Sequence, residues 1–203
     1  MNTLLSPLES FRKQLDFSSI SEERKSILQE LIHYVQTQKS EGKEIHLNFI
    51  CTHNSRRSQL SQLWAQTASF YYGVKTFCYS GGVEVTAFNE RAVASINRFG
   101  FKVEQSGEGN PKYAVSFSEN ENPLIMFSKL YDDASSAQSN FAAVMTCSHA
   151  DENCPFIPGA NNRIPARYED PKAFDDTELE SAKYDERSKE IATEMFYVFS
   201  QVR

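Results

Sequence analysis

A short polar segment carries the residues of this 203-residue chain whose types and spacing suggest chemistry. Cys51 follows an apolar run at 45–50, five residues separate it from Arg57, and Ser58 comes next. Such a loop can wrap around one tetrahedral oxyanion, whose charge the loop amides and the start of a following helix would stabilise. Arg57 could bind two anion oxygens through its planar guanidinium, while Cys51 attacks as a thiolate and Ser58 donates a hydrogen bond to its sulfur.

The elements around this segment are those that an anion loop requires. The run at 45–50 predicts a strand buried on both faces of a parallel sheet, and 60–72 has apolar residues at helical spacing. A cysteine at the end of a buried strand can also be a plain structural residue, and spacing alone does not decide between these interpretations. The order of strand, polar loop and helix favours catalysis.

Residues 51–59 read Cys-Thr-His-Asn-Ser-Arg-Arg-Ser-Gln. This sequence resembles the signature loop of the low-molecular-weight protein tyrosine phosphatases and of the thioredoxin-coupled arsenate reductases built on the same fold. Gln59 is more similar to the reductases. The positions that match the pattern of both groups are Cys51, Asn54, Arg57 and Ser58.

Two positions of the loop depart from the family pattern. His53 stands where the family usually has glycine, and Arg56 stands where it often has a second cysteine. Because glycine lets a backbone approach an anion closely, either the loop is remodelled here or His53 lines its rim. The resemblance implies an oxyanion-binding set of Thr52, His53, Asn54, Ser55, Arg56 and Arg57.

A strand that ends on a cysteine occurs a second time. The apolar run at 141–146 leads to Cys147, and Cys154 follows seven positions later with Pro155 behind it. Zinc could recruit Cys147, His149 and Cys154, although a fourth ligand is not evident, and two unrelated structural thiols are another interpretation. The pair resembles the redox cysteines of the thioredoxin-coupled arsenate reductases, which plain phosphatases are not expected to carry.

An acid precedes a proline late in the chain, in Tyr168-Glu-Asp-Pro171. Proline restricts the preceding residue to extended geometry, so Asp170 would be held in a defined direction on a loop. Asp-Pro is also an ordinary turn signal. In the family that the chain resembles, a late Asp-Pro carries the general acid. Lys172 and Ala173 then stand where phosphatases usually have aromatic residues, which weakens the phosphatase interpretation.

Composition limits the classes of protein that remain. A net charge of −6 and an isoelectric point of about 5.3 argue against nucleic acid and an anionic membrane surface as partners. No apolar run is long enough to span a bilayer, and residues 1–17 lack the apolar core of a signal peptide. We therefore expect a cytoplasmic protein. Four scattered cysteines are too few for a disulfide framework, and Cys78 is predicted to be a core residue.

The chain divides into a helical N-terminal extension, 1–44, and a domain, 45–203. Ser19 and Glu22 fit a capping box at the start of the main helix of the extension. In the domain we expect strands at 74–79 and 141–146, a turn at 80–82, and helices at 89–99 and 178–199. The runs at 113–117 and 124–127 predict a hairpin with a longer loop, or alternatively one of them belongs to the central sheet. The resemblance implies an α/β fold of three layers with a short parallel sheet, and a site at the carboxyl ends of its strands.

The favoured function is reduction of arsenate to arsenite without a metal or cofactor. By resemblance, Cys51 attacks arsenic while Asp170 protonates the leaving oxygen. Cys147 then attacks Cys51, and Cys154 moves the disulfide outward for thioredoxin. A low-molecular-weight protein tyrosine phosphatase that uses Cys51, Arg57 and Asp170 on phosphate esters is the main alternative. A non-catalytic anion- or redox-sensing module, in which His53 has impaired the loop, is a third.

Overall fold

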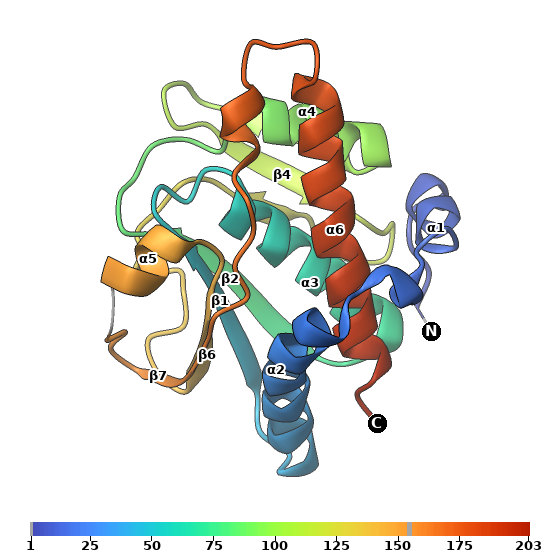
Figure 1. Ribbon diagram of the computed structural model, residues 1–203, viewed down its shortest axis with the longest axis vertical. Helices are drawn as coiled ribbons and strands as arrows, with labels where there is room; N and C mark the ends of the chain where they lie inside the picture. Colours follow the sequence, from blue (N-terminus) through green and yellow to red (C-terminus); the bar gives the residue numbers. More distant parts are fainter. Residues whose placement is uncertain (1, 154–155) are drawn as a thin grey trace.

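The structure is a computed structural model that describes residues 2–153 and 156–203 (Figure 1). Its helices are α1 (Ser6–Arg12), α2 (Glu22–Ser40), α3 (Arg57–Tyr72), α4 (Glu90–Phe99), α5 (Ser148–Asn153) and α6 (Glu180–Ser200), with short 3-10 turns η1 (Phe17–Ser19) and η2 (Pro171–Phe174). Its strands are β1 (Ile45–Cys51), β2 (Thr76–Gly82), β3 (Lys102–Ser106), β4 (Lys112–Ser116), β5 (Leu124–Met126), β6 (Phe141–Met145) and β7 (Ala160–Ile164).

The central sheet has the strand order β2-β1-β6-β7, and every neighbouring pair is parallel. Helices lie on both sides of it, which confirms the predicted α/β fold with a short parallel sheet (Figure 1). Ile50 of β1 is level with Met145 of β6, and the Thr146 amide donates to the Ile50 carbonyl at 2.8 Å. The residues that follow these two strands therefore leave the sheet at the same edge.

The two faces of the sheet bury different side chains because side chains alternate along a strand. Leu47, Phe49 and Val144 point into the main core, which also takes apolar residues from α2, α3 and α6. Ile50 and Met145 point to the opposite face, into a smaller cluster that contains both Cys51 and Cys147. The two cysteines therefore share one small apolar cluster on the α5 side of the sheet.

The N-terminal extension is part of the main core rather than a separate body. Leu8 of α1 and Leu28 and Leu31 of α2 are buried with residues of α3 and α6. The predicted capping box is wrong, since the Ser21 hydroxyl accepts from the Arg24 amide and caps α2. Ser19 instead closes the turn η1.

The turn predicted at 80–82 is wrong, because β2 continues through those residues in register with β1, up to a pair between Cys51 and Gly82. A Cβ on Gly82 would lie 2.7 Å from the Asn54 amide nitrogen, and one on Gly81 would lie 2.2 Å from the Tyr131 Cα. Without side chains at these positions, the strand can pass directly behind the anion loop.

Three further elements were not expected from the sequence. The hairpin of β4 and β5 gains a third strand, β3, which is largely exposed and therefore lacks a clear apolar pattern. The edge strand β7 is polar for the same reason. Residues 148–153, for which the sequence predicted no element, form the short helix α5. No helix among the described residues is long and apolar enough to cross a membrane.

Candidate active site

The anion loop between β1 and α3 is held by hydrogen bonds among its own side chains. Asn54 donates from Nδ2 to Ser58 Oγ at 2.9 Å, and its Oδ1 accepts from Gln59 Nε2 at 3.2 Å. Gln59 also donates to the Asn54 carbonyl at 3.0 Å. All three side chains are buried, so these bonds are shielded from competing water. The arrangement fixes the course of the loop before any ligand binds.

Cys51 lies at the base of the loop with Ser58 as its partner. The Cys51 Sγ and Ser58 Oγ atoms are 3.0 Å apart, and the cysteine is 3% exposed. Because Asn54 already donates to Ser58 Oγ, the Ser58 hydroxyl is free to direct its own hydrogen at the sulfur. A hydroxyl that donates to sulfur favours the thiolate, which is the nucleophilic form.

The backbone of the loop is suited to an anion. In the described part of the chain, the amide groups of residues 53–56 donate no hydrogen bond. Asn54 has a left-handed φ of 46°, whereas His53 is not among the residues with positive φ, so a non-glycine residue at 53 causes no backbone strain. The His53 imidazole lies 45% exposed, 3.4 Å from Glu84, and thus lines the rim.

The segment after β5 supports the loop from outside. The Ser128 hydroxyl donates to the His53 carbonyl at 2.9 Å, and the Lys129 amide donates to Asn54 Oδ1 at 2.9 Å. Gln59 reaches the Phe127 carbonyl at 2.8 Å. The sequence showed no signal for this support, because these residues lie about 70 positions from the loop and have no distinctive pattern.

Arg57 contacts the loop that carries Asp170. Its Nη1 donates to the Tyr168 carbonyl at 3.1 Å, and its Nη2 donates to Asp170 Oδ2 at 2.7 Å. The Arg57 Nε atom is buried and has no hydrogen-bond partner among the described residues. A buried donor without a partner is costly, so this N–H is a natural contact for an anion oxygen. Asp170 also accepts from the Lys172 amide at 3.1 Å, which fixes its carboxylate on η2.

A buried charged group holds Tyr168, and with it the loop of Asp170. Arg24 of α2 makes two hydrogen bonds to the Glu194 carboxylate, at 2.6 and 2.8 Å, and the Tyr168 hydroxyl donates to the same carboxylate at 2.6 Å. Burial and the nearby Glu194 charge raise the pKa of Tyr168 well above its ordinary value, which keeps the phenol protonated as a donor. The N-terminal extension thus contributes to the position of the acid loop.

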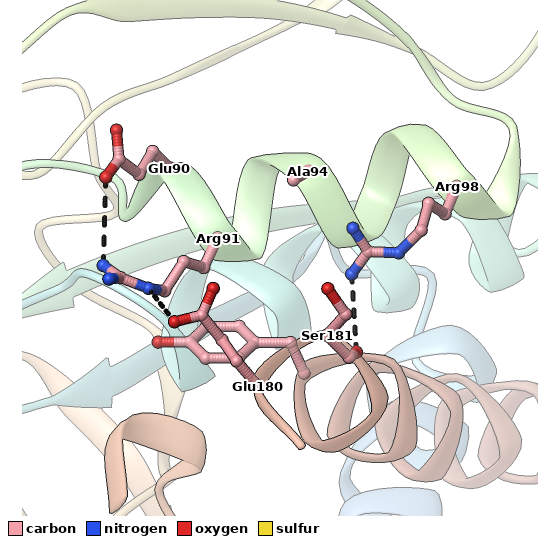
Figure 2. A pocket seen from close by; sticks show the side chains of 7 residues that line it. Glu90, Arg91, Ala94, Arg98, Glu180 and Ser181 are labelled. Atoms are coloured by element: carbon pink, nitrogen blue, oxygen red, sulfur yellow. Dashed lines mark hydrogen bonds and ion pairs between the residues drawn. The ribbon is translucent and has the colours of Figure 1, made fainter. Parts of the chain in front are cut away.

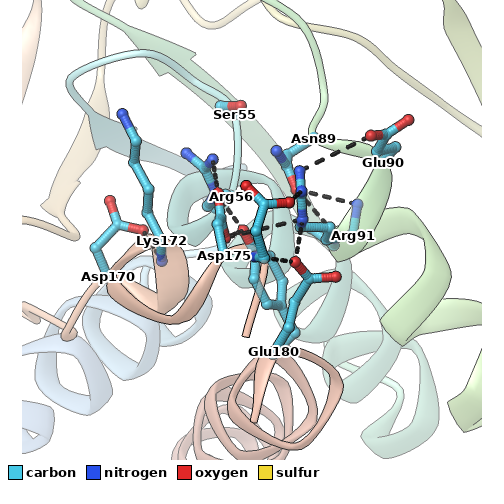
Figure 3. Close-up of polar contacts among 12 residues, drawn as sticks. Ser55, Arg56, Asn89, Glu90, Arg91, Asp170, Lys172, Asp175 and Glu180 are labelled. Atoms are coloured by element: carbon cyan, nitrogen blue, oxygen red, sulfur yellow. Dashed lines mark hydrogen bonds and ion pairs between the residues drawn. The ribbon is translucent and has the colours of Figure 1, made fainter. Parts of the chain in front are cut away.

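The side chain of Arg56 contacts Asp175 and Tyr184, outside the anion loop (Figure 3). Its Nε donates to the Tyr184 hydroxyl at 2.7 Å, and its Nη2 lies 3.3 Å from Asp175. Tyr184 in turn donates to Asp175 at 2.8 Å. The Ser55 hydroxyl likewise donates to the Ala87 carbonyl at 2.7 Å. The side chains of Arg56 and Ser55 therefore brace the loop, and only their amides remain for an anion.

A cavity of about 370 Å³ lies between α4 and α6, beside this network (Figure 2). The arginines that line it already have partners: Arg91 pairs with Glu180 of the lining at 2.6 Å, and Arg98 pairs with Asp185, which does not line the cavity, at 2.7 Å. Neither Cys51 nor Arg57 lines it. We therefore place the chemistry at the anion loop and not in this cavity.

Cys147 lies beside the anion loop. Its Sγ is 3.5 Å from the hydroxyl of Thr52, and the Ala150 amide donates to the sulfur at 3.4 Å. The residue is 1% exposed. Its predicted partner Cys154 lies outside the described residues. Within them, no three histidine, cysteine, aspartate or glutamate side chains come together as a metal site.

Helix α5 is anchored to another part of the chain through Asp151. Asp151 is 3% exposed in its side chain and pairs with Arg163 and Arg167 on the neighbouring chain segment. The Asn153 side chain donates to the His149 carbonyl at 2.8 Å.

Cys78 takes no part in this arrangement. It is buried in the main core, and burial raises the pKa of its thiol.

The fold and the loop define a class, the three-layer phosphatase fold with a cysteine-based anion loop. Among solved structures, a low-molecular-weight phosphotyrosine phosphatase from Vibrio cholerae O395 covers 77% of this chain and 94% of its own, with a TM-score of 0.51 and 10% identity. A Bacillus subtilis structure, of a YwlE mutant, covers 78% and 98% with a TM-score of 0.50 and 12% identity. These likenesses show the fold.

In sequence, the chain is similar to proteins named arsenate reductase. Arsenate reductases from two Bacillus cereus strains are 28% and 29% identical over 135 residues, which is 66% of this chain and 83% of theirs. One from Bacillus anthracis is 28% identical over 123 residues, 61% of this chain and 74% of its own. No protein-family model matches the chain. The comparisons confirm the resemblance to this group of arsenate reductases and low-molecular-weight phosphatases.

Proposed function

We propose that the chain reduces arsenate to arsenite through a relay of three thiols. The observation that carries this proposal is the position of Cys147, a second buried thiol that shares an apolar cluster with Cys51 and lies 3.5 Å from Thr52 of the anion loop. Hydrolysis of a phosphate ester requires only one thiol. The similarity to proteins named arsenate reductase supports the same conclusion.

The anion loop would bind arsenate as it would any tetrahedral oxyanion. The amides of residues 53–56, which donate no hydrogen bond in the described part of the chain, would direct their partial positive charge at the ligand, and α3 begins directly after them. Arg57 supplies the charged contact, with Nε free to bind one oxygen. Because the bound anion competes with Asp170 for the guanidinium, its arrival would release the carboxyl group from Arg57.

The first step is attack by the Cys51 thiolate on arsenic. A sulfur–arsenic bond forms while an arsenic–oxygen bond breaks, and Asp170 gives its proton to the departing oxygen, which leaves as water. Ser58 stabilises Cys51 as the thiolate before this step.

The second step transfers two electrons to arsenic, and the third moves the resulting disulfide away from Cys51. The Cys147 thiolate attacks Cys51 Sγ, the sulfur–arsenic bond breaks, and its electron pair leaves with arsenic as arsenite. The Cys51–Cys147 disulfide that remains is attacked by the Cys154 thiolate at Cys147, which frees Cys51 as a thiolate. Thioredoxin, a dithiol protein of the cytoplasm, would then reduce the Cys147–Cys154 disulfide.

The direct test is arsenate-dependent consumption of NADPH in the presence of thioredoxin and thioredoxin reductase. We expect steady turnover that stops in Cys51→Ser, Cys147→Ser and Cys154→Ser. Cys154→Ser should still release one arsenite per chain and stall with a Cys51–Cys147 disulfide, which mass spectrometry would detect. Equal turnover by the parent chain and the two later serine variants would overturn the relay.

A phosphatase is the second candidate, because the fold is shared and Asp170 lies beside Arg57 at 2.7 Å. It would hydrolyse phosphate monoesters through a cysteinyl-phosphate on Cys51. Hydrolysis of a small aryl phosphate that survives Cys147→Ser, without any turnover of arsenate, would establish it. A sensing module would show neither activity, and any rate that disappears in Cys51→Ser excludes that alternative.

A further inference from the structure

The side chain of Thr52 lies between His149 and the thiol of Cys147. The His149 Nδ1 atom is 3.2 Å from Thr52 Oγ1, and the same hydroxyl is 3.5 Å from Cys147 Sγ. Thr52 is 9% exposed and Cys147 is 1% exposed, whereas His149 is exposed. The three groups therefore form a continuous path from a buried thiol, through a buried hydroxyl, to an imidazole in contact with solvent.

Such a path would let the proton of Cys147 leave, which the proposed relay requires. Cys147 attacks as a thiolate, but the buried thiol has no direct access to water that could take its proton. A hydroxyl can accept one hydrogen bond while it donates another, so Thr52 can receive the thiol proton and pass its own onward. An imidazole nitrogen that carries no proton is the acceptor that this transfer needs.

We propose that His149, acting through the Thr52 hydroxyl, accepts the proton of Cys147 and so prepares it for attack on Cys51. The inference rests on the proposed function and adds a positioning residue to it. The proton moves from Cys147 Sγ to Thr52 Oγ1 as the Thr52 hydroxyl proton moves to His149 Nδ1. The Ala150 amide, 3.4 Å from the sulfur, stabilises the thiolate that results.

The charged groups around His149 leave it free for this role. On its own helix, the Asp151 carboxylate is bound by Arg163 and Arg167. On the anion loop, the other histidine, His53, pairs with Glu84 at 3.4 Å. Glu152 is the remaining acid of α5 and is exposed to solvent. His149 is thus the titratable side chain that contacts the Thr52 hydroxyl in the part of the chain that the structure describes.

The test measures the single release of arsenite in a Cys154→Ser background, in which the reaction stops after Cys147 has attacked. His149→Asn retains an oxygen near the position of Nδ1 that can accept from Thr52, but this oxygen is not a base. We expect the single-turnover rate at neutral pH to fall about 10-fold, since a positioned base typically contributes this much or more. The rate should recover as the pH rises, because hydroxide can then take the proton of the Thr52 hydroxyl, which is 9% exposed, in place of the imidazole.

The controls separate this inference from the proposed function. If Cys154→Ser with His149 intact releases no arsenite, the relay itself is wrong. His33→Asn, a change of the same kind at an exposed position on α2, should leave the rate unchanged. His149→Ala should be rescued by added imidazole, and Thr52→Val should lose the rate without rescue. A rate in His149→Asn equal to that of the background, or lowered equally at every pH, would overturn the inference.

Discussion

The anion loop and the segment that carries Cys147 leave the same edge of the sheet, but they are held differently. The loop is fixed by its own buried side chains, Asn54, Ser58 and Gln59, and is supported from behind by Gly82 and from outside by Ser128 and Lys129. Helix α5 has only six residues and is anchored mainly through Asp151. An anion site must keep its donors in place, whereas a thiol that passes a disulfide onward has to move.

This difference has a physical basis in local stability. A segment with few buried contacts opens at a lower free energy than one inside a dense network of buried hydrogen bonds. Preorganised donors also stabilise charge without a cost of reorganisation at the moment of reaction. In the proposed relay, the rigid loop would bind the anion and the lightly anchored helix would carry the exchanging thiol, so substitutions in the two regions should fail in different ways.

Substitution of the two thiols should give the sharpest contrast. Cys51→Ser should reduce both arsenate turnover and any aryl phosphate hydrolysis by at least about 1,000-fold, because the nucleophile of both reactions is lost. Cys147→Ser should stop arsenate turnover equally but leave aryl phosphate hydrolysis unchanged. Steady-state rates on the two substrates measure this, and a loss of both activities in Cys147→Ser would contradict the division of roles.

Arg57→Lys keeps the positive charge but removes the planar guanidinium, which can bind two oxygens at once. This change should lower arsenate turnover by about 10-fold or more. Lysine can neither replace the contacts to Tyr168 and Asp170 together nor offer Nε to the anion. Arg56→Lys is the matched control, since that side chain braces Tyr184 and Asp175. Comparable losses of turnover in the two variants would remove Arg57 from its special role.

The buried pair of Arg24 and Glu194 should matter for stability. Arg24→Met leaves the Glu194 carboxylate buried without its main partner, which should lower the free energy of unfolding by about 3–5 kcal/mol. Denaturant unfolding measures this, and the exposed pair of Lys25 and Glu22 provides the control, with an expected change below about 1 kcal/mol. A loss in Arg24→Met as small as that in Lys25→Met would mean that the extension does not support the acid loop.

Loss of the ion pairs that Asp151 makes from α5 should slow arsenate turnover but not aryl phosphate hydrolysis. Asp151→Asn keeps the shape of the side chain but removes the charge that holds Arg163 and Arg167. We expect arsenate turnover to fall several-fold, about 3- to 10-fold, with aryl phosphate hydrolysis unaffected. If both activities fell together, the anchor would serve the anion loop as well, and the contrast between the two regions would be smaller than the structure indicates.

Cys78→Ala should have the smallest effect, with unchanged turnover and a stability loss of about 1 kcal/mol at neutral pH. Burial raises the pKa of this thiol above its value in the unfolded chain, which is about 8.5. Its contribution to stability is therefore complete below that pH and declines as the pH rises through it. Unfolding curves from pH 7 to 10 should show a smaller alkaline loss in Cys78→Ala than in the parent chain. Parallel losses would contradict this assignment.

The sequence alone determined the local parts of the site. An apolar run followed by Cys51, Arg57 and Ser58 predicts a strand, a loop and a helix, because local spacing controls each of these. Proline after Asp170 predicts a fixed acid in the same way. The predictions failed where no local pattern exists, as in the exposed strands β3 and β7, and at Gly81 and Gly82, which suggest a turn but lie in a strand.

Only the tertiary structure decided which distant residues meet. The register of β1 against β6 brings Thr52 to Cys147 and His149, which lie 95 and 97 positions away in the chain. The packing of α2 on α6 brings Arg24 to Glu194, 170 positions away. Such contacts depend on how whole elements pair and pack, and a shift of one residue in the register would turn every side chain to the other face. The residue types at the site and the contact of Cys51 with Ser58 can therefore be read locally, whereas the contact of Cys147 with Thr52 depends on the complete sheet.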